Sequence, residues 1–202
     1  MRRFALALVL AVAGLGLVAP PAGAAPQNLT GILGDLWTTV LELPRTDNPF
    51  ASGDPCVELR GNIVAPISGG GVAECTVRHG TKILFSGWTT ECSTFEGNGT
   101  TEAELRTCAQ DTDAEISPSA TFNGEPIQLS SVETKLLRIS LPEDNIMKFL
   151  YPDREFDLTG LSVAHGYEYL TQPLKRGKLT IVNNVTLGDG STQEITTVIF
   201  VE

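Results

Sequence analysis

The chain has 202 residues, of which 42% are hydrophobic and 19% are charged. It is therefore long enough to bury a sizeable core and too apolar for an intrinsically disordered protein. The formal net charge of −10 excludes a nucleic-acid-binding function, because binding to a phosphate backbone requires clustered Lys and Arg.

The first 24 residues have the features of a secretory signal peptide. Arg2 and Arg3 precede an uncharged apolar stretch at 4–18, and the small residues at 22–24 are typical of a cleavage site. The stretch is shorter than the roughly 20 residues that cross a bilayer. We expect a secreted chain without a transmembrane segment. Removing these 24 of the 202 residues, which include two arginines and no acid, leaves 178 residues with a net charge of −12.

Residues 25–55 are expected to form an N-terminal helix and a connecting loop that pack on the domain. Asn28 or Thr30 can cap the helix, and Pro44 ends it. The polar face carries Asp35 and Glu42 in place of basic residues, which disfavours a membrane-surface helix. Apolar residues recur with helical spacing at Leu29, Ile32, Leu33, Leu36, Trp37, Val40 and Leu41.

Residues 56–202 are expected to form one mainly β domain. Asn123 and Gly124 tolerate the positive φ of a tight hairpin, and Thr101 and Glu104 have the capping-box spacing of a short helix at 101–110. Little other helix is indicated, which favours an antiparallel β-sandwich, jelly-roll or immunoglobulin-like. Strands are predicted at 57–64, 74–77, 82–88, 116–122, 127–129, 134–141, 162–170, 179–187 and 194–201.

The four cysteines of an exported chain are expected to form two disulfide bonds. Three pairings are possible. We favour the local one, Cys56 with Cys75 and Cys92 with Cys108, because each bond then closes a short loop and contributes about 3 kcal/mol. A metal or redox site is the alternative, but no CxxC spacing supports it.

No catalytic residue is predicted from the sequence. The Gly-x-Ser-x-Gly motif of many serine hydrolases is absent, and neither His79 nor His165 lies in a recognised motif. Each histidine is interpreted as a surface or packing residue.

Carboxylates are concentrated at 91–115, which holds seven acids and one arginine. Asp111, Asp113 and Glu115 alternate in a way that would let a loop converge on Ca²⁺, a cation with six to eight oxygen ligands. A solvated acidic edge is the alternative. The same segment supports a second functional hypothesis, a carboxylate-based or calcium-assisted secreted hydrolase acting on polysaccharide.

Aromatic side chains are the candidates for sugar binding, because sugars stack their apolar faces on exposed rings. Trp88, Tyr167 and Tyr169 are the candidates, and the two tyrosines share one face of a predicted strand. Core packing is the alternative for all three residues.

The order of motifs resembles a family of uncharacterised secreted microbial proteins with four cysteines and a β-rich domain. The resemblance covers nearly the whole mature chain and implies secretion and disulfide bonds, but it brings no established activity. The chain departs from the family at 57–64, where the family has a Trp-Phe pair. The motifs that carry the resemblance are Trp37, Leu43-Pro44, Asn48-Pro49, Gly53, the four cysteines, 79–85, 91–94, 104–109, Asn123-Gly124, Pro142, 144–146, 164–167, Pro173-Leu174 and Gly177.

The leading functional hypothesis is therefore a non-catalytic binding domain that is extracellular or associated with the cell envelope. Its expected partner is cell-wall polysaccharide or an extracellular protein. A purely structural envelope component is a third possibility.

Overall fold

The computed structural model describes residues 28–67 and 72–202, so the expected signal peptide lies outside the described residues. The helices are α1 (Leu29–Glu42), η1 (Arg45–Asp47), α2 (Pro49–Ser52), α3 (Glu102–Ala114) and α4 (Ile146–Leu150). The strands are β1 (Cys56–Leu59), β2 (Ile63–Pro66), β3 (Val72–Val77), β4 (Lys82–Ser93), β5 (Ser117–Phe122), β6 (Glu125–Ile127), β7 (Ser130–Glu133), β8 (Leu137–Ser140), β9 (Thr159–Leu170), β10 (Gly177–Thr186) and β11 (Thr192–Val201). Among these described helices, none is long and apolar enough to cross a membrane.

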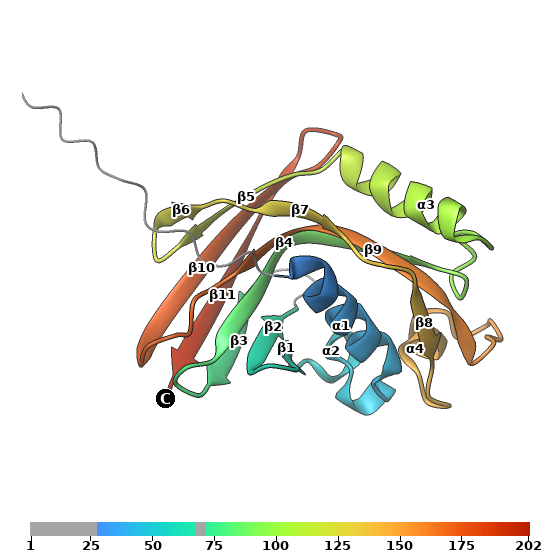
Figure 1. The fold of residues 1–202 in the computed structure, drawn as a ribbon, viewed down its shortest axis with the longest axis horizontal. Helices are drawn as coiled ribbons and strands as arrows, with labels where there is room; N and C mark the ends of the chain where they lie inside the picture. The colour runs from blue at the N-terminus through green and yellow to red at the C-terminus, as the bar shows by residue number, and fades with distance from the viewer. Residues whose placement is uncertain (1–27, 68–71) are drawn as a thin grey trace, which may run out of the picture.

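The strands form two sheets that pack against each other, which confirms the predicted β-sandwich (Figure 1). One sheet has the order β1-β2-β4-β9-β7, with β8 also paired to β9, and the other has the order β3-β11-β10-β5-β6. Buried side chains between the sheets include Ile83 and Phe85 of β4, Ile181 of β10 and Ile199 of β11. These side chains form the core of the sandwich.

The sheets are mixed and not wholly antiparallel as predicted. Strands β2 and β4 are parallel, as are β3 and β11. The chain leaves β2 to form β3 in the second sheet and returns to the first sheet as β4, so β2 and β4 run in the same direction. Hydrophobic alternation predicts strands but does not identify such long-range partners.

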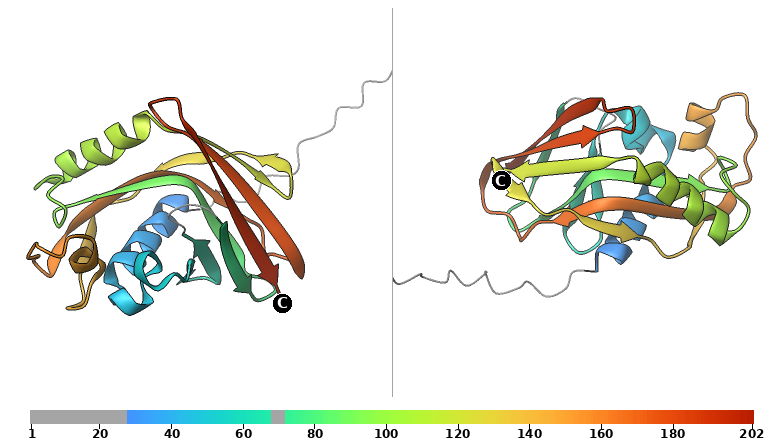
Figure 2. Two further views of the ribbon diagram at one scale, coloured as in Figure 1. Left: turned by 180° about the vertical axis from the view of Figure 1, so that it is seen from behind. Right: turned by 90° about the horizontal axis from the view of Figure 1, so that it is seen from above.

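The two longer helices cover opposite faces of the β4–β9 sheet (Figures 1 and 2). Helix α1 packs Leu36 and Val40 against a cluster that includes Leu84 of β4. Helix α3 packs Leu105 against Val163 of β9. Helix α3 covers only one end of its face and the second sheet covers the other end (Figure 1), so side chains of β4 and β9 between them, such as Thr90 and His165, are half-buried.

Several element boundaries differ from the predicted ones. Asn28 caps α1 by accepting a hydrogen bond from Gly31 N, and Asn123-Gly124 form the predicted two-residue turn with positive φ at both positions. The predicted strand at 57–64 is a β1–β2 hairpin, because Gly61 and Asn62 adopt positive φ and turn the chain. The capping box of α3 is present as predicted, but the helix continues to Ala114.

Both disulfide bonds have the predicted local pairing. Cys56–Cys75 links β1 to β3 and so joins the two sheets. Cys92–Cys108 links β4 to α3. The second bond therefore fixes the helix that carries Asp113 to the sheet beneath it.

Candidate functional site

A cleft opens beside strand β4, where that strand loses its neighbour. Strand β2 pairs with β4 only at Lys82 and Ile83. Further along β4 the cleft has a volume of about 300 Å³ and lies between this strand, α1, α2 and the second sheet. Its apolar lining includes Trp37, Phe50, Ile67, Phe85, Trp88 and Ile195.

The two cleft tryptophans are held by hydrogen bonds from their indole N–H groups. Trp37 Nε1 donates to Thr89 Oγ1 at 3.0 Å, and Trp88 Nε1 donates to Thr90 Oγ1 at 3.1 Å. With both N–H groups satisfied, the rings offer the cleft mainly apolar surface. They are the only tryptophans of the chain, so tryptophan fluorescence reports on this site.

One polar group in the cleft wall has no partner. Asn183 is 2% exposed, and its Nδ2 donates to the carbonyl oxygen of Gly87 at 2.6 Å. Its Oδ1 accepts no hydrogen bond from the part of the chain that the structure describes. A buried acceptor without a donor costs about 1–3 kcal/mol. A bound molecule whose hydroxyl or N–H group reached this atom would remove that cost.

A buried carboxyl group lies behind the cleft wall. Ser86, which lines the cleft, donates its hydroxyl to Glu168 Oε2 at 2.7 Å. Glu168 is fully buried, and this burial raises its pKa from 4.5 to about 8. The group is therefore mostly protonated and uncharged at neutral pH. The cleft wall thus carries no anionic charge from Glu168, which suits a neutral ligand.

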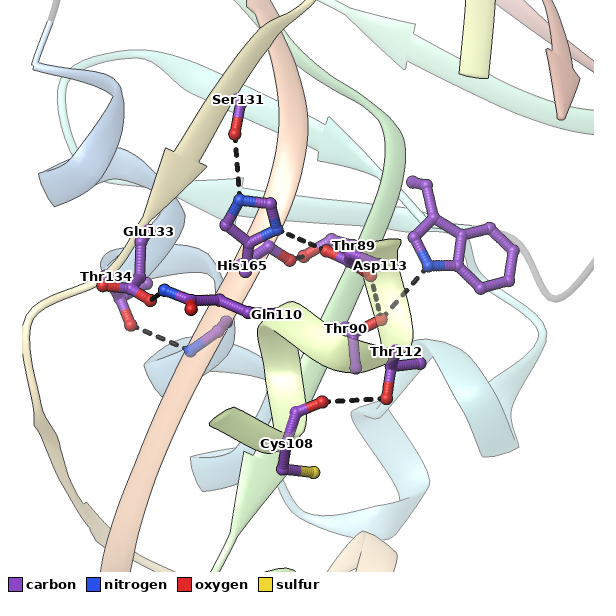
Figure 3. Close-up of polar contacts among 12 residues, drawn as sticks. Thr89, Thr90, Cys108, Gln110, Thr112, Asp113, Ser131, Glu133, Thr134 and His165 are labelled. Carbon is purple, nitrogen blue, oxygen red and sulfur yellow. Dashed lines mark hydrogen bonds and ion pairs between the residues drawn. The ribbon is translucent and has the colours of Figure 1, made fainter. Parts of the chain in front are cut away.

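A second polar arrangement lies on the face of the sheet that α3 partly covers (Figure 3). His165 of β9 contacts Ser131 of β7 through Nε2, at 2.9 Å from Oγ, and Asp113 of α3 through Nδ1, at 2.6 Å from Oδ2. The other oxygen of Asp113 accepts a hydrogen bond from Thr90. The arrangement has the order serine, histidine, carboxylate.

The members of this second arrangement differ in their burial. The side chain of Asp113 is 1% exposed and that of His165 is 14% exposed, whereas Ser131 is exposed. The strand pairing of β7 with β9 fixes Ser131 relative to His165, and the Cys92–Cys108 bond fixes the helix that bears Asp113. Only the serine end of the array is fully open to solvent.

The predicted sugar-binding aromatics do not form one surface. Trp88 lines the cleft, whereas Tyr169 packs against the core between the sheets. Tyr167 lines a separate hollow of about 470 Å³, formed with residues 116–119 and 127–129. Tyr167 and Tyr169 share one face of β9 as predicted, and both side chains are half-buried against the second sheet.

The predicted calcium ligands lie on helix α3 and at its end and not in a loop. Asp111 and Asp113 are two positions apart on the helix, which separates their directions by about 200°. Asp113 is instead bonded to His165, and Glu115 follows the helix as its C-cap. In the described ranges, no group of three or more Asp, Glu, His or Cys side chains could hold a metal ion. Calcium binding and the carboxylate hydrolase stay untested predictions.

Sequence reasoning missed Asn183 of the cleft and the link between Ser131, His165 and Asp113. Ser131 lies 34 positions before His165 in the chain and Asp113 lies 52 positions before it, and no local motif surrounds these residues. Such an array is recognised by geometry and not by sequence. Comparison of the chain with family models, curated proteins and solved structures found no match.

Proposed function

We propose that this protein is a secreted, extracellular binding domain whose cleft beside β4 holds a small, neutral and largely apolar molecule with one hydrogen-bond donor. The observation that carries the proposal is the unpartnered Oδ1 of Asn183, a buried residue that lines the cleft. Natural sites for small molecules combine an apolar lining with a few placed polar groups, and they have volumes of roughly 300–1,000 Å³. The cleft has both properties.

The polar groups of the cleft support a single anchoring point for the ligand. The hydroxyl of Thr89 accepts from Trp37 and donates to the carbonyl oxygen of His165, and the hydroxyl of Ser86 donates to Glu168. Among the described residues that line the cleft, Asn183 Oδ1 is the buried side-chain acceptor without a hydrogen-bond partner. A ligand donor placed there would be desolvated together with its acceptor.

The charge of the protein supports a neutral ligand. The chain has a net charge of −10, which disfavours the approach of anionic amphiphiles such as fatty acids. No described cation lines the cleft to offset that charge. The two disulfide bonds support the extracellular location, because such bonds persist in oxidising compartments.

The test uses N-phenyl-1-naphthylamine, a neutral apolar fluorophore with one N–H donor. We expect saturable binding at one site, with quenching of Trp37 and Trp88 by energy transfer to the probe. Replacing Asn183 by alanine removes the acceptor, so the dissociation constant should rise roughly fivefold, the equivalent of about 1 kcal/mol.

The matched control is Asn184→Ala, which changes the next residue of β10, whose side chain points to the opposite face of the strand. It should bind the probe like the wild type. Absence of saturable binding, or equal affinity in both alanine variants, would contradict the proposed anchoring.

A further inference from the structure

We propose that Ser131 is a nucleophile activated by His165, and that this second site transfers acyl groups from small neutral esters to water. The proposal is independent of ligand binding in the cleft. A serine within hydrogen-bond reach of a histidine that is oriented by a third group is the arrangement that activates a hydroxyl nucleophile. Ser131, His165 and Asp113 have these contacts at 2.9 Å and 2.6 Å.

Asp113 has the position of an orienting group. Its carboxylate contacts Nδ1 of His165, which leaves Nε2 facing the hydroxyl of Ser131. The Thr90 hydroxyl bonds the second oxygen of Asp113 and Trp88 in turn donates to Thr90. This chain of contacts holds the carboxylate in one orientation, so Asp113 is a positioning residue.

The pairing of β7 with β9 leaves the backbone N–H of Ser131 free to act as a hydrogen-bond donor. Thr134 N donates to Ala164 O, which makes residues 134, 132 and 130 the hydrogen-bonded positions of the β7–β9 ladder. Ser131 alternates with them, so its own N–H points away from β9, toward the outer edge of β7. An N–H at the nucleophile is a donor of the kind that stabilises the oxyanion of acyl transfer.

A hollow beside the nucleophile can hold the acyl part of a substrate. Tyr167 is the register partner of Ser131, and its ring lies edge-on to the ring of His165 with the centroids 5.8 Å apart. The hollow of about 470 Å³ lined by Tyr167 and Leu129 therefore begins next to the reacting pair. Glu133 is paired with Arg106, so it adds no free charge, but the carboxylate of Asp113 and the net charge of −10 disfavour an anionic ester. The substrate class is therefore a neutral ester with a short acyl chain.

The reaction has two balanced steps. The Ser131 Oγ attacks the ester carbonyl carbon and loses its proton to His165 Nε2, and the C–O bond to the alcohol breaks as that proton passes to the leaving oxygen. A water molecule then attacks the acyl-serine, giving its proton to His165. The carboxylic acid leaves, and the proton returns to Ser131.

The test uses an alkyl fluorophosphonate, which forms a P–O bond to an activated serine and releases fluoride, followed by peptide mass spectrometry of the folded full-length protein. We expect an adduct on Ser131 and hydrolysis of p-nitrophenyl butyrate, both lost in Ser131→Ala. The matched control is Ser130→Ala, the adjacent exposed serine on the opposite face of β7, which should keep both. His165→Gln should slow labelling by roughly 10²-fold or more.

A further variant tests whether Asp113 orients His165, separately from any role of Asp113 in folding. Asp113→Asn keeps the shape of the buried side chain, so it should also slow labelling while leaving the near-ultraviolet circular dichroism unchanged. No adduct on Ser131, or hydrolysis that persists in Ser131→Ala at the wild-type rate, would overturn the proposal. Labelling of Ser131 without ligand binding in the cleft would refute only the proposed cleft function.

Discussion

Replacing Glu168 by glutamine should make the protein more stable at pH 8 but not at pH 5. Glu168 is fully buried, and desolvation by burial raises its pKa from 4.5 to about 8. Glutamine has nearly the same shape as the protonated acid and can accept the Ser86 hydroxyl bond. The glutamine therefore mimics the protonated side chain that Glu168 has at low pH, and it never ionises.

The stability depends on pH because the folded and unfolded states hold the Glu168 proton over different pH ranges. Below about pH 4.5 both the folded and unfolded states hold the Glu168 proton, so the stabilisation that this proton gives is fully present. Between that pH and about 8 only the folded state holds it, so the unfolding free energy of the wild type falls as the pH rises. One pKa unit corresponds to about 1.4 kcal/mol, so the loss is of the order of 4 kcal/mol by pH 8.

The assay is urea unfolding of both proteins at pH 5 and pH 8, monitored by tryptophan fluorescence. Glu91, whose pKa burial also raises to about 8, gives both proteins a further decline with pH, so the difference between them isolates Glu168. We expect the advantage of Glu168→Gln to grow by several kcal/mol from pH 5 to pH 8. An equal difference at the two pH values would refute the reasoning.

Three further changes test the packing that supports the two sites. Gly166→Ala would place its Cβ 2.8 Å from the backbone carbonyl oxygen of Trp88 and 2.8 Å from Thr89 Cβ, so thermal unfolding should show a loss of roughly 1–3 kcal/mol in the free energy of unfolding. Replacing Cys92 and Cys108 together by alanine opens a loop with a sequence separation of 16, which should lower the free energy of unfolding by about 3 kcal/mol in urea titrations. Asn48→Ala removes a fully buried amide that donates to the carbonyl oxygen of Val40 at 2.6 Å and caps α2. Calorimetry should therefore show a loss of roughly 2 kcal/mol in the free energy of unfolding. Unchanged stability in any of these variants would contradict the corresponding contact.

Local sequence patterns predict the helices, strands and turns better than they predict which strands pair with each other. The apolar stripe of α1 and the Asn123-Gly124 turn depend on residues close in the chain, and both are present. The sequence pattern does not predict the hairpin at Gly61 and Asn62, because the apolar residues on its two sides resemble one continuous strand. The parallel pairing of β2 with β4 arises from a crossing between sheets, which no local pattern encodes.

The candidate sites were less predictable than the fold for the same reason. Trp88 was identified by residue type, and it does line a cleft, but the partners that complete the cleft come from α1, α2 and the second sheet. The sequence places Asp113 among neighbouring acids, whereas the continuation of α3 to Ala114 turns its side chain toward His165. Contacts between distant segments decide the chemistry at both sites.

The cleft itself is tested most directly by filling it. Ile195 of β11 lines the cleft, whereas the adjacent Glu194 is exposed and does not. Titration of N-phenyl-1-naphthylamine, followed by the probe's own fluorescence, should give a dissociation constant at least roughly tenfold higher for Ile195→Trp than for the wild type. Glu194→Trp should bind like the wild type. Wild-type affinity in a folded Ile195→Trp variant would contradict the assignment of this cleft as the binding site.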